Sequence, residues 1–205
     1  MSEDPHLALP PLVILGDARL ARPSVPLDPA TILTAAFQER LQTLQQAMFH
    51  YLGIGIAAPQ IGWFERFFLM TATLPNAQGE LEPVVQAWIN PEIVSASPEQ
   101  CWAWEGCLSV PGLRGWIRRP QSVAVRGTNE RGEAVGLEYT GWNARVFQHE
   151  FDHLDGMLFP YRAVDPRHVV ATKALEERED WPADWPAPQA RDTPLGEVWP
   201  EPQES

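Results

Sequence analysis

The sequence has few cysteines, few basic residues and no long apolar run. We expect its two cysteines, Cys101 and Cys107, to form no structural disulfide in a reducing compartment, so either is available as a ligand, a nucleophile or a core residue. Lysine and arginine total 15 against 27 aspartate and glutamate residues, and the net charge of −12 argues against nucleic-acid binding, which needs a basic patch. No stretch approaches the ~20 apolar residues that cross a membrane. We therefore expect neither a nucleic-acid nor a membrane partner.

The N-terminus also lacks a targeting pattern. Residues 1–9 contain Glu3, Asp4 and Pro5 in place of the basic start and apolar stretch of a secretory signal. Unless a targeting segment has been cleaved off, we expect a soluble, cytoplasmic protein. The length of 205 residues and the hydrophobic content of 44% suit one globular domain with a tail.

Composition divides the chain near residue 179. We expect residues 1–179 to form a single catalytic domain. Residues 180–205 contain three Trp-Pro pairs and several acids but little periodicity, which is typical of a segment that cannot bury enough surface to order itself. We predict an acidic, mobile or surface-draped tail, whose tryptophans would favour docking on the domain or on a partner.

Periodicity predicts three helices and several strands. Apolar residues recur at spacings of four and three within 28–53, which predicts a helix there, and we expect further helices over 140–156 and from 168 to about 180. Short apolar runs bounded by turn residues predict strands. These runs cover 64–70, 84–89, 122–127 and 134–139.

The second predicted helix carries an HExxH motif, His149 to His153. Residues four apart share one face of a helix, so both imidazoles can reach one ion, and Glu150 is close enough to a water on that ion to act as a general base. The helix is apolar on more than one side, so it should be buried, and its polar groups then need the partner that a metal supplies. Trp142 and Val146 share the histidine face and should line an apolar pocket.

A catalytic metal of this kind takes a third protein ligand. At the position where one zinc-protease class has a third histidine, this chain has Phe159, which cannot bind. Glu176 and Glu177 are downstream candidates, and they would make the protein an HExxH endopeptidase. Cys107 and Cys101 are upstream candidates. Spacing alone does not decide among these candidate ligands.

Two further segments have the composition of a site. In Gly53 to Gln60, GIGIAAPQ, the glycines and alanines let the backbone approach a ligand closely. Gln60 has an amide that can donate to a developing oxyanion. Cys107 lies in the second segment, EGCLS, which begins at Glu105.

In order and spacing, GIGIAAPQ, EGCLS and QHEFDH resemble the three signature motifs of the peptide deformylase family, whose pattern covers most of residues 10 to about 162. The resemblance implies an α+β fold in which small antiparallel sheets surround the HExxH helix. It also implies the reaction, which is hydrolysis of the N-formyl group from the initiator methionine of nascent chains, releasing formate.

The resemblance implies roles for individual residues. Cys107, His149 and His153 match the metal ligands, and Glu150 matches the acid/base. The native ion would be Fe(II), with Zn, Ni or Co able to replace it. Gln60 and the backbone N–H of Leu108 match the groups that polarise the formyl oxygen. The remaining candidates would bind substrate; they are Ile54, Gly55, Glu105, Arg114, Trp142 and Val146.

One departure from the family concerns its partners. Some members have a basic C-terminal helix that docks on the ribosome, whereas residues 176–180 here read EERED. Ribosomal RNA would repel this acidic stretch, so ribosome association by this route is disfavoured. A second alternative is a non-catalytic relative that only binds peptides, but the counterparts of Gln60 and Glu150 argue against it.

Overall fold

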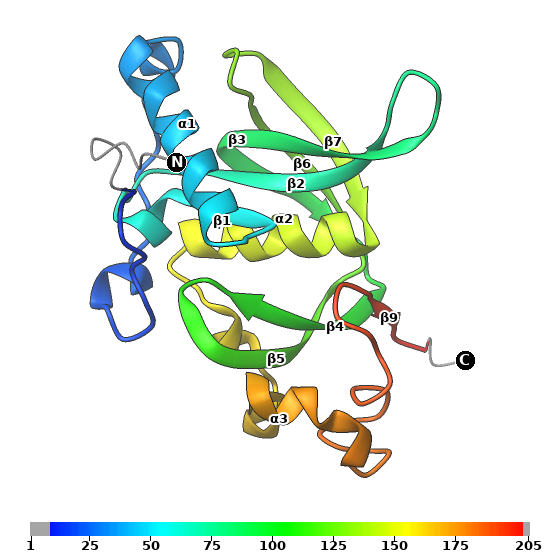
Figure 1. The fold of residues 1–205 in the computed structure, drawn as a ribbon. Helices are drawn as coiled ribbons and strands as arrows, with labels where there is room; N and C mark the ends of the chain where they lie inside the picture. The colour runs from blue at the N-terminus through cyan, green and yellow to red at the C-terminus, as the bar shows by residue number, and fades with distance from the viewer. Residues whose placement is uncertain (1–8, 203–205) are drawn as a thin grey trace, which may run out of the picture.

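One helix, α2 (Gly141–Leu154), lies between two antiparallel sheets in the computed structural model, which describes residues 9–202 (Figure 1). The upper sheet has the order β1 (Gly55–Ala57), β2 (Phe67–Pro75), β3 (Leu81–Ala96), β6 (Ser122–Thr128) and β7 (Ala134–Thr140). The lower sheet has the order β8 (Val169–Ala171), β5 (Val110–Pro120), β4 (Gln100–Cys107) and β9 (Trp199–Pro200). The prediction of an α+β fold with small antiparallel sheets around the HExxH helix is confirmed.

The upper sheet is covered by helices on both faces. Side chains alternate between the faces of a strand, and β2 shows the consequence. Phe67 and Leu69 pack in one apolar cluster with α1 (Ala35–His50), while Phe68 and Met70 pack in another with α2. The upper sheet therefore fixes the position of α2 from above.

Both long helices occur where the sequence predicts them, with shorter bounds. The predicted apolar stripe of α1 is buried, but Thr34 caps this helix, while Asp28 caps a separate 3-10 turn, Pro29–Thr31. Helix α2 begins directly after the extended residue Thr140. Each of the four predicted strands lies in or overlaps a strand of the upper sheet.

The prediction of a third helix, from 168 to about 180, is wrong over most of its length. A 3-10 turn ends at His168, and β8 follows because Val169 and Val170 pair with Gly115 and Arg114 of β5. Only Thr172–Glu176 forms an α-helix, α3. His168 is buried and packs edge-on against Trp102.

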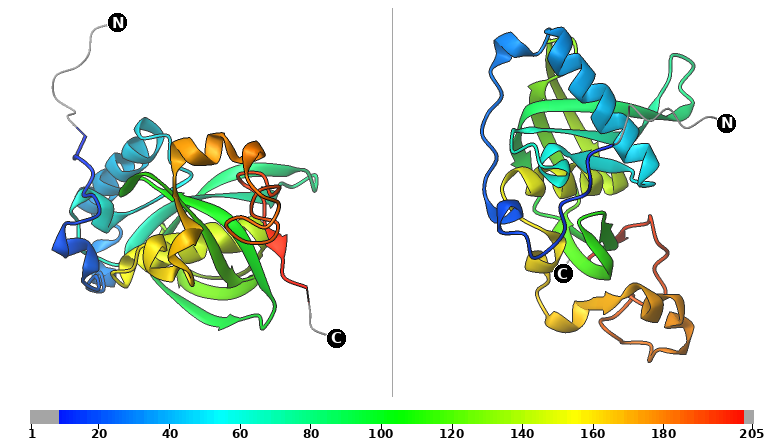
Figure 2. Two further views of the ribbon diagram at one scale, coloured as in Figure 1. Left: turned by 90° about the horizontal axis from the view of Figure 1, so that it is seen from below. Right: turned by 60° about the vertical axis from the view of Figure 1, so that its left-hand side comes forward.

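The end of the chain returns to the lower sheet (Figures 1 and 2). We call residues 181–202 the C-terminal segment. It contacts a cluster around the buried Trp104 and Trp116, and its β9 pairs with β4. The tail therefore lies on the chain's own domain, which is one of the two docking sites that its tryptophans suggested. Residues 1–8 and 203–205 lie outside the described part of the chain. Within residues 9–202 no helix is both long and apolar enough to cross a membrane.

Candidate metal centre and active site

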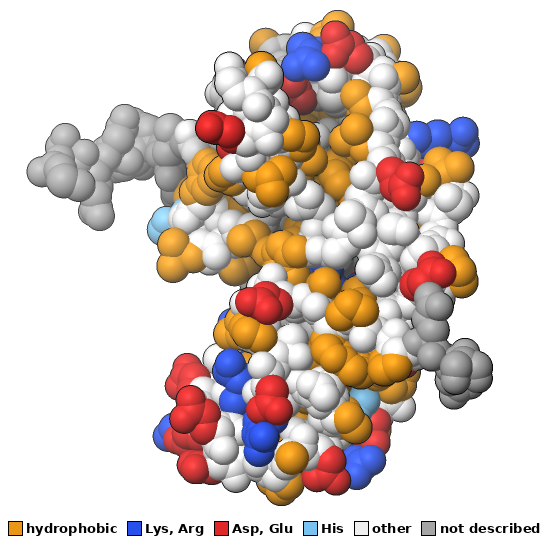
Figure 3. Space-filling model, turned by 90° about the vertical axis from the view of Figure 1, so that its right-hand side faces the viewer, with side chains coloured by type: hydrophobic (Ala, Val, Ile, Leu, Met, Phe, Trp, Pro, Cys, Tyr) orange, Lys and Arg blue, Asp and Glu red, His pale blue; other side chains and the backbone are white. Residues whose placement is uncertain are grey.

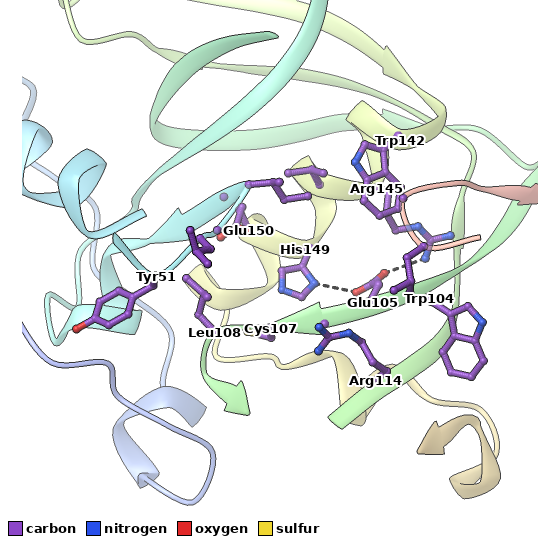
Figure 4. Close-up of a pocket in the computed structure, with 18 of the residues that line it drawn as sticks. Tyr51, Trp104, Glu105, Cys107, Leu108, Arg114, Trp142, Arg145, His149 and Glu150 are labelled. Atoms are coloured by element: carbon purple, nitrogen blue, oxygen red, sulfur yellow. Dashed lines mark hydrogen bonds and ion pairs between the residues drawn. The ribbon is translucent and has the colours of Figure 1, made fainter. Parts of the chain in front are cut away.

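A cavity of about 450 Å³ opens between α2 and the strands that face it (Figure 4). Its volume is that of a small-ligand pocket. It is lined by residues 51–55, Gln60, residues 104–108, Arg114, Trp142, Arg145, Val146, His149, Glu150, Leu195 and Gly196. All of the predicted site residues except His153 are in this lining. The Nε2 atom of His153 lies 3.3 Å from the sulfur of Cys107.

Three side chains form a potential metal site. The ligand atoms of Cys107, His149 and His153 all lie within 4.8 Å of one another. No other group of three or more potential ligands is this close together within residues 9–202. The cysteine comes from the end of β4 and both histidines come from one face of α2. Glu176 and Glu177, the alternative third ligands, are not in the group.

Glu105 fixes the orientation of the His149 ring. Its carboxylate lies 2.8 Å from Nδ1 of His149 (Figure 4). When the Nδ1–H of the neutral ring donates to the carboxylate, Nε2 is the nitrogen that would bind an ion. Burial raises the pKa of Glu105, but the charges of Arg119 and Arg145 and the bond from His149 outweigh it and hold that pKa well below its usual range.

Cys107 is held as a thiolate. Burial raises its pKa, but the positive charge of His153 and hydrogen bonds from His149 and His153 lower it to about 5. Burial lowers the pKa of His149, yet the bonds to Cys107 and Glu105 raise it well above the usual value. The thiolate and the Glu105 carboxylate therefore stabilise a positive charge on the His149 ring, which contacts both. One thiolate and two imidazoles are ligands that Zn²⁺ and other divalent transition metals accept, so the residues fit such an ion.

Glu150 is poised to exchange a proton near neutral pH. Its carboxylate is buried, and Oε2 has no hydrogen-bond partner. Burial raises its pKa to about 7, against the opposing charges of His149 and His153. A Cβ on Gly55 would overlap the Glu150 carboxylate, so glycine is needed for this close approach.

The Gln60 amide is aimed by its neighbours. Its Oε1 accepts from the backbone N–H of Ala57 at 2.8 Å, and its Nε2 donates to Ser109 Oγ at 3.2 Å while lying 3.5 Å from Cys107 Sγ. The bond from Ala57 fixes which end of the amide is the donor. The NH₂ group therefore faces the thiolate side of the cavity, as an oxyanion donor must.

Sequence reasoning missed two buried arginines that hold this site together. Arg119 is 3% exposed and bridges Glu105 and Asp152. Arg145 donates to Glu105 and to the carbonyls of Ile117 and Cys101. The sequence around each arginine contains a pattern that indicates burial. Arg119 lies two residues after the apolar Ile117 on one strand face, and Arg145 lies on the same helical face as His149.

Comparisons with known proteins agree on one family. Residues 9–168 match the family model described as polypeptide deformylase. The chain is 44% identical to the peptide deformylase of Thermotoga neapolitana over 147 residues, covering 72% of this chain and 84% of that protein. It is 37% identical to peptide deformylase 2 of Nostoc sp. over 171 residues, covering 82% and 93%.

Solved structures give the same result. The peptide deformylase of Thermotoga maritima superposes with a TM-score of 0.67 at 37% identity, covering 78% of this chain and 100% of that one. The Met-Ala-Ser-bound class I type b peptide deformylase of Acinetobacter baumannii superposes with a TM-score of 0.68 at 33% identity, covering 74% and 96%.

Proposed function

This chain belongs to the peptide deformylase family, and from that premise we propose how its own residues carry out the reaction. It is a metal-dependent hydrolase that removes N-formyl groups from peptides. Cys107, His149 and His153 hold the ion, and Glu150 is the acid/base. The observation that carries this assignment is the convergence of three ligand atoms within 4.8 Å beside a buried carboxylate.

The catalytic groups act in sequence on one amide. When bound, the ion supplies a Lewis acid that makes water nucleophilic near neutral pH. Glu150 takes the proton from the attacking water and delivers it to the departing amine. The amide of Gln60 and the backbone N–H of Leu108 donate to the formyl oxygen as it becomes negative. The C–N bond breaks, the formyl carbon leaves as formate, and a free amino terminus remains.

The substrate lies along β1. This strand is at the edge of the upper sheet, where Gly55 pairs with Met70 on one side only. An extended peptide adds to the other edge through the backbone of Ile54 and Gly55. Trp142 and Val146 then form the apolar compartment for the first side chain, and Arg114 lies at the margin of the cavity. Glu105 acts through His149 as a positioning residue.

We propose Fe(II) as the native ion, with Zn, Ni or Co able to replace it. The support is the family membership together with a donor set of one thiolate and two imidazoles. Metal analysis of protein purified under argon identifies the ion. The substrates are N-formyl-methionyl nascent polypeptides in the cytoplasm, and the acidic stretch 176–180 disfavours ribosome docking through that part of the chain.

The decisive experiment measures formate release from formyl-Met-Ala-Ser by Fe(II)-loaded protein under argon. Glu150→Gln should retain the metal and lose deformylation, because it keeps the shape of the side chain but cannot accept the proton. Glu138→Gln, an exposed position on β7, is the matched control and should behave as wild type. Normal turnover by Glu150→Gln would refute the assignment of the acid/base.

A further inference from the structure

The C-terminal segment reaches the active site from outside the matched part of the chain. The family model ends at residue 168, whereas Leu195 and Gly196 line the same cavity as His149 and Glu150. The structure therefore adds a cavity wall that the residues of the family match do not provide.

Two anchors fix the segment on either side of this wall. Before it, the buried Trp104 donates from Nε1 to the carbonyl of Ala190 at 2.7 Å. After it, Trp199 pairs with Trp102, whose Nε1 donates to the Glu201 carboxylate at 3.2 Å. Both anchoring tryptophans belong to the first half of β4, so the chain between the anchors forms an arch beside this strand.

The arch crosses from β4 to the beginning of α2. A Cβ on Gly141, the first residue of α2, would lie 3.8 Å from Val198, which is ordinary van der Waals contact. Gly196 has a φ of +87°, a left-handed conformation that turns the chain here. In Figure 4 the arch passes beside the labelled Trp142 and Trp104, at the end of the cavity away from Tyr51.

We infer that Leu195 and Gly196 form the outer wall of the compartment that receives the first side chain of the substrate, and that this wall sets the size of side chain accepted. The inference rests on the proposed function, in which Trp142 and Val146 form the inner wall. Leu195 is apolar yet 53% exposed, so a substrate side chain has apolar surface to cover. Figure 3 shows the surface hollowed between its upper and lower halves, with apolar side chains gathered at that level.

Two variants with opposite effects test the wall. Leu195→Ala widens the compartment, so the KM for formyl-Met-Ala-Ser should rise about fivefold with kcat unchanged, and the preference for formyl-Met over formyl-Phe should fall by a similar factor. Leu195→Trp narrows it, so the preference for formyl-Ala over formyl-Met should rise about tenfold. Leu137→Ala on β7, with a leucine 40% exposed and outside the cavity, is the matched control and should change none of these values.

A binding measurement separates this inference from the proposed function. The affinities of Met-Ala-Ser, Phe-Ala-Ser and Ala-Ala-Ser for metal-loaded wild type and both variants are measured by calorimetry, which needs no turnover. If wild type releases no formate but the variants shift these affinities as described, the proposed function fails and the wall stands. If wild type is active and both variants keep the side-chain ratios within about twofold in both assays, the inference is overturned.

Discussion

The acid/base that we assign to catalysis should weaken the metal-free fold above neutral pH. Burial raises the pKa of Glu150 from 4.5 to about 7. A carboxyl with a raised pKa contributes stability that is fully present below its unfolded pKa and is lost as pH rises through its folded pKa. For Glu150 the loss therefore falls between pH 4.5 and about 7. Each pKa unit is worth about 1.4 kcal/mol, so the shift amounts to about 3 kcal/mol.

Glu150→Gln removes this ionisation while it preserves the shape of the side chain. In urea unfolding of the metal-free protein, the variant should match wild type near pH 4.5 or below and be more stable by about 3 kcal/mol near pH 8. For a domain of this size the gap corresponds to about 6–12 °C in Tm. The exposed control Glu138→Gln should show no gap at either pH. A stability difference for Glu150→Gln that does not change with pH would refute the reasoning, because ionisation of the buried carboxyl is its only proposed source.

Two further substitutions separate the roles of neighbouring groups. Glu105→Gln removes the charge that orients His149 and pairs with Arg119. Metal affinity, measured by competition titration with a chelator, should therefore fall about 10- to 100-fold. Unchanged affinity would show that packing alone holds the His149 ring. Gln60→Glu keeps the acceptor for the Ala57 N–H but removes the oxyanion donor. At full metal occupancy kcat should therefore fall about 100-fold or more. A kcat near that of wild type would show that Gln60 does not stabilise the oxyanion.

The HExxH helix could be predicted from sequence because its signals are local. Four-residue spacing puts His149 and His153 on one face, and the helix ends within two residues of the predicted bounds. The contacts of α1 follow from the same kind of periodicity. The helix position and the ligand face therefore depend little on distant parts of the chain.

The lower sheet was missed, and its two short strands, β8 and β9, depend on partners far away in sequence. Val169 and Val170 form β8 only because β5 provides an edge for them, and the residues alone fit a helix equally well. The tail has no periodicity of its own, and its docking depends on Trp104 and Trp102 of β4. Burial of Arg119 likewise follows from two carboxylates that come from other elements.

Helix α2 is attached to its two sheets by different kinds of interaction. Its buried apolar side chains, including Phe147 and Leu154, cluster with the upper sheet. Its contacts with the lower sheet run through Arg145 and His149 to Glu105 and through Asp152 to Arg119. The upper apolar cluster contains no carboxylate, so this attachment does not depend on an ionised acid.

The lower attachment depends on ionised carboxylates. Both Glu105 and Asp152 have lowered pKa values; burial alone would raise them, but Arg119 and its neighbours hold them down. Such groups stabilise the fold above their unfolded pKa and lose that contribution as pH falls through the folded value. Acid therefore acts on this molecule asymmetrically. We expect it to loosen the sheet that provides Cys107 and anchors the outer cavity wall, while the helix with both histidines stays packed on the other sheet.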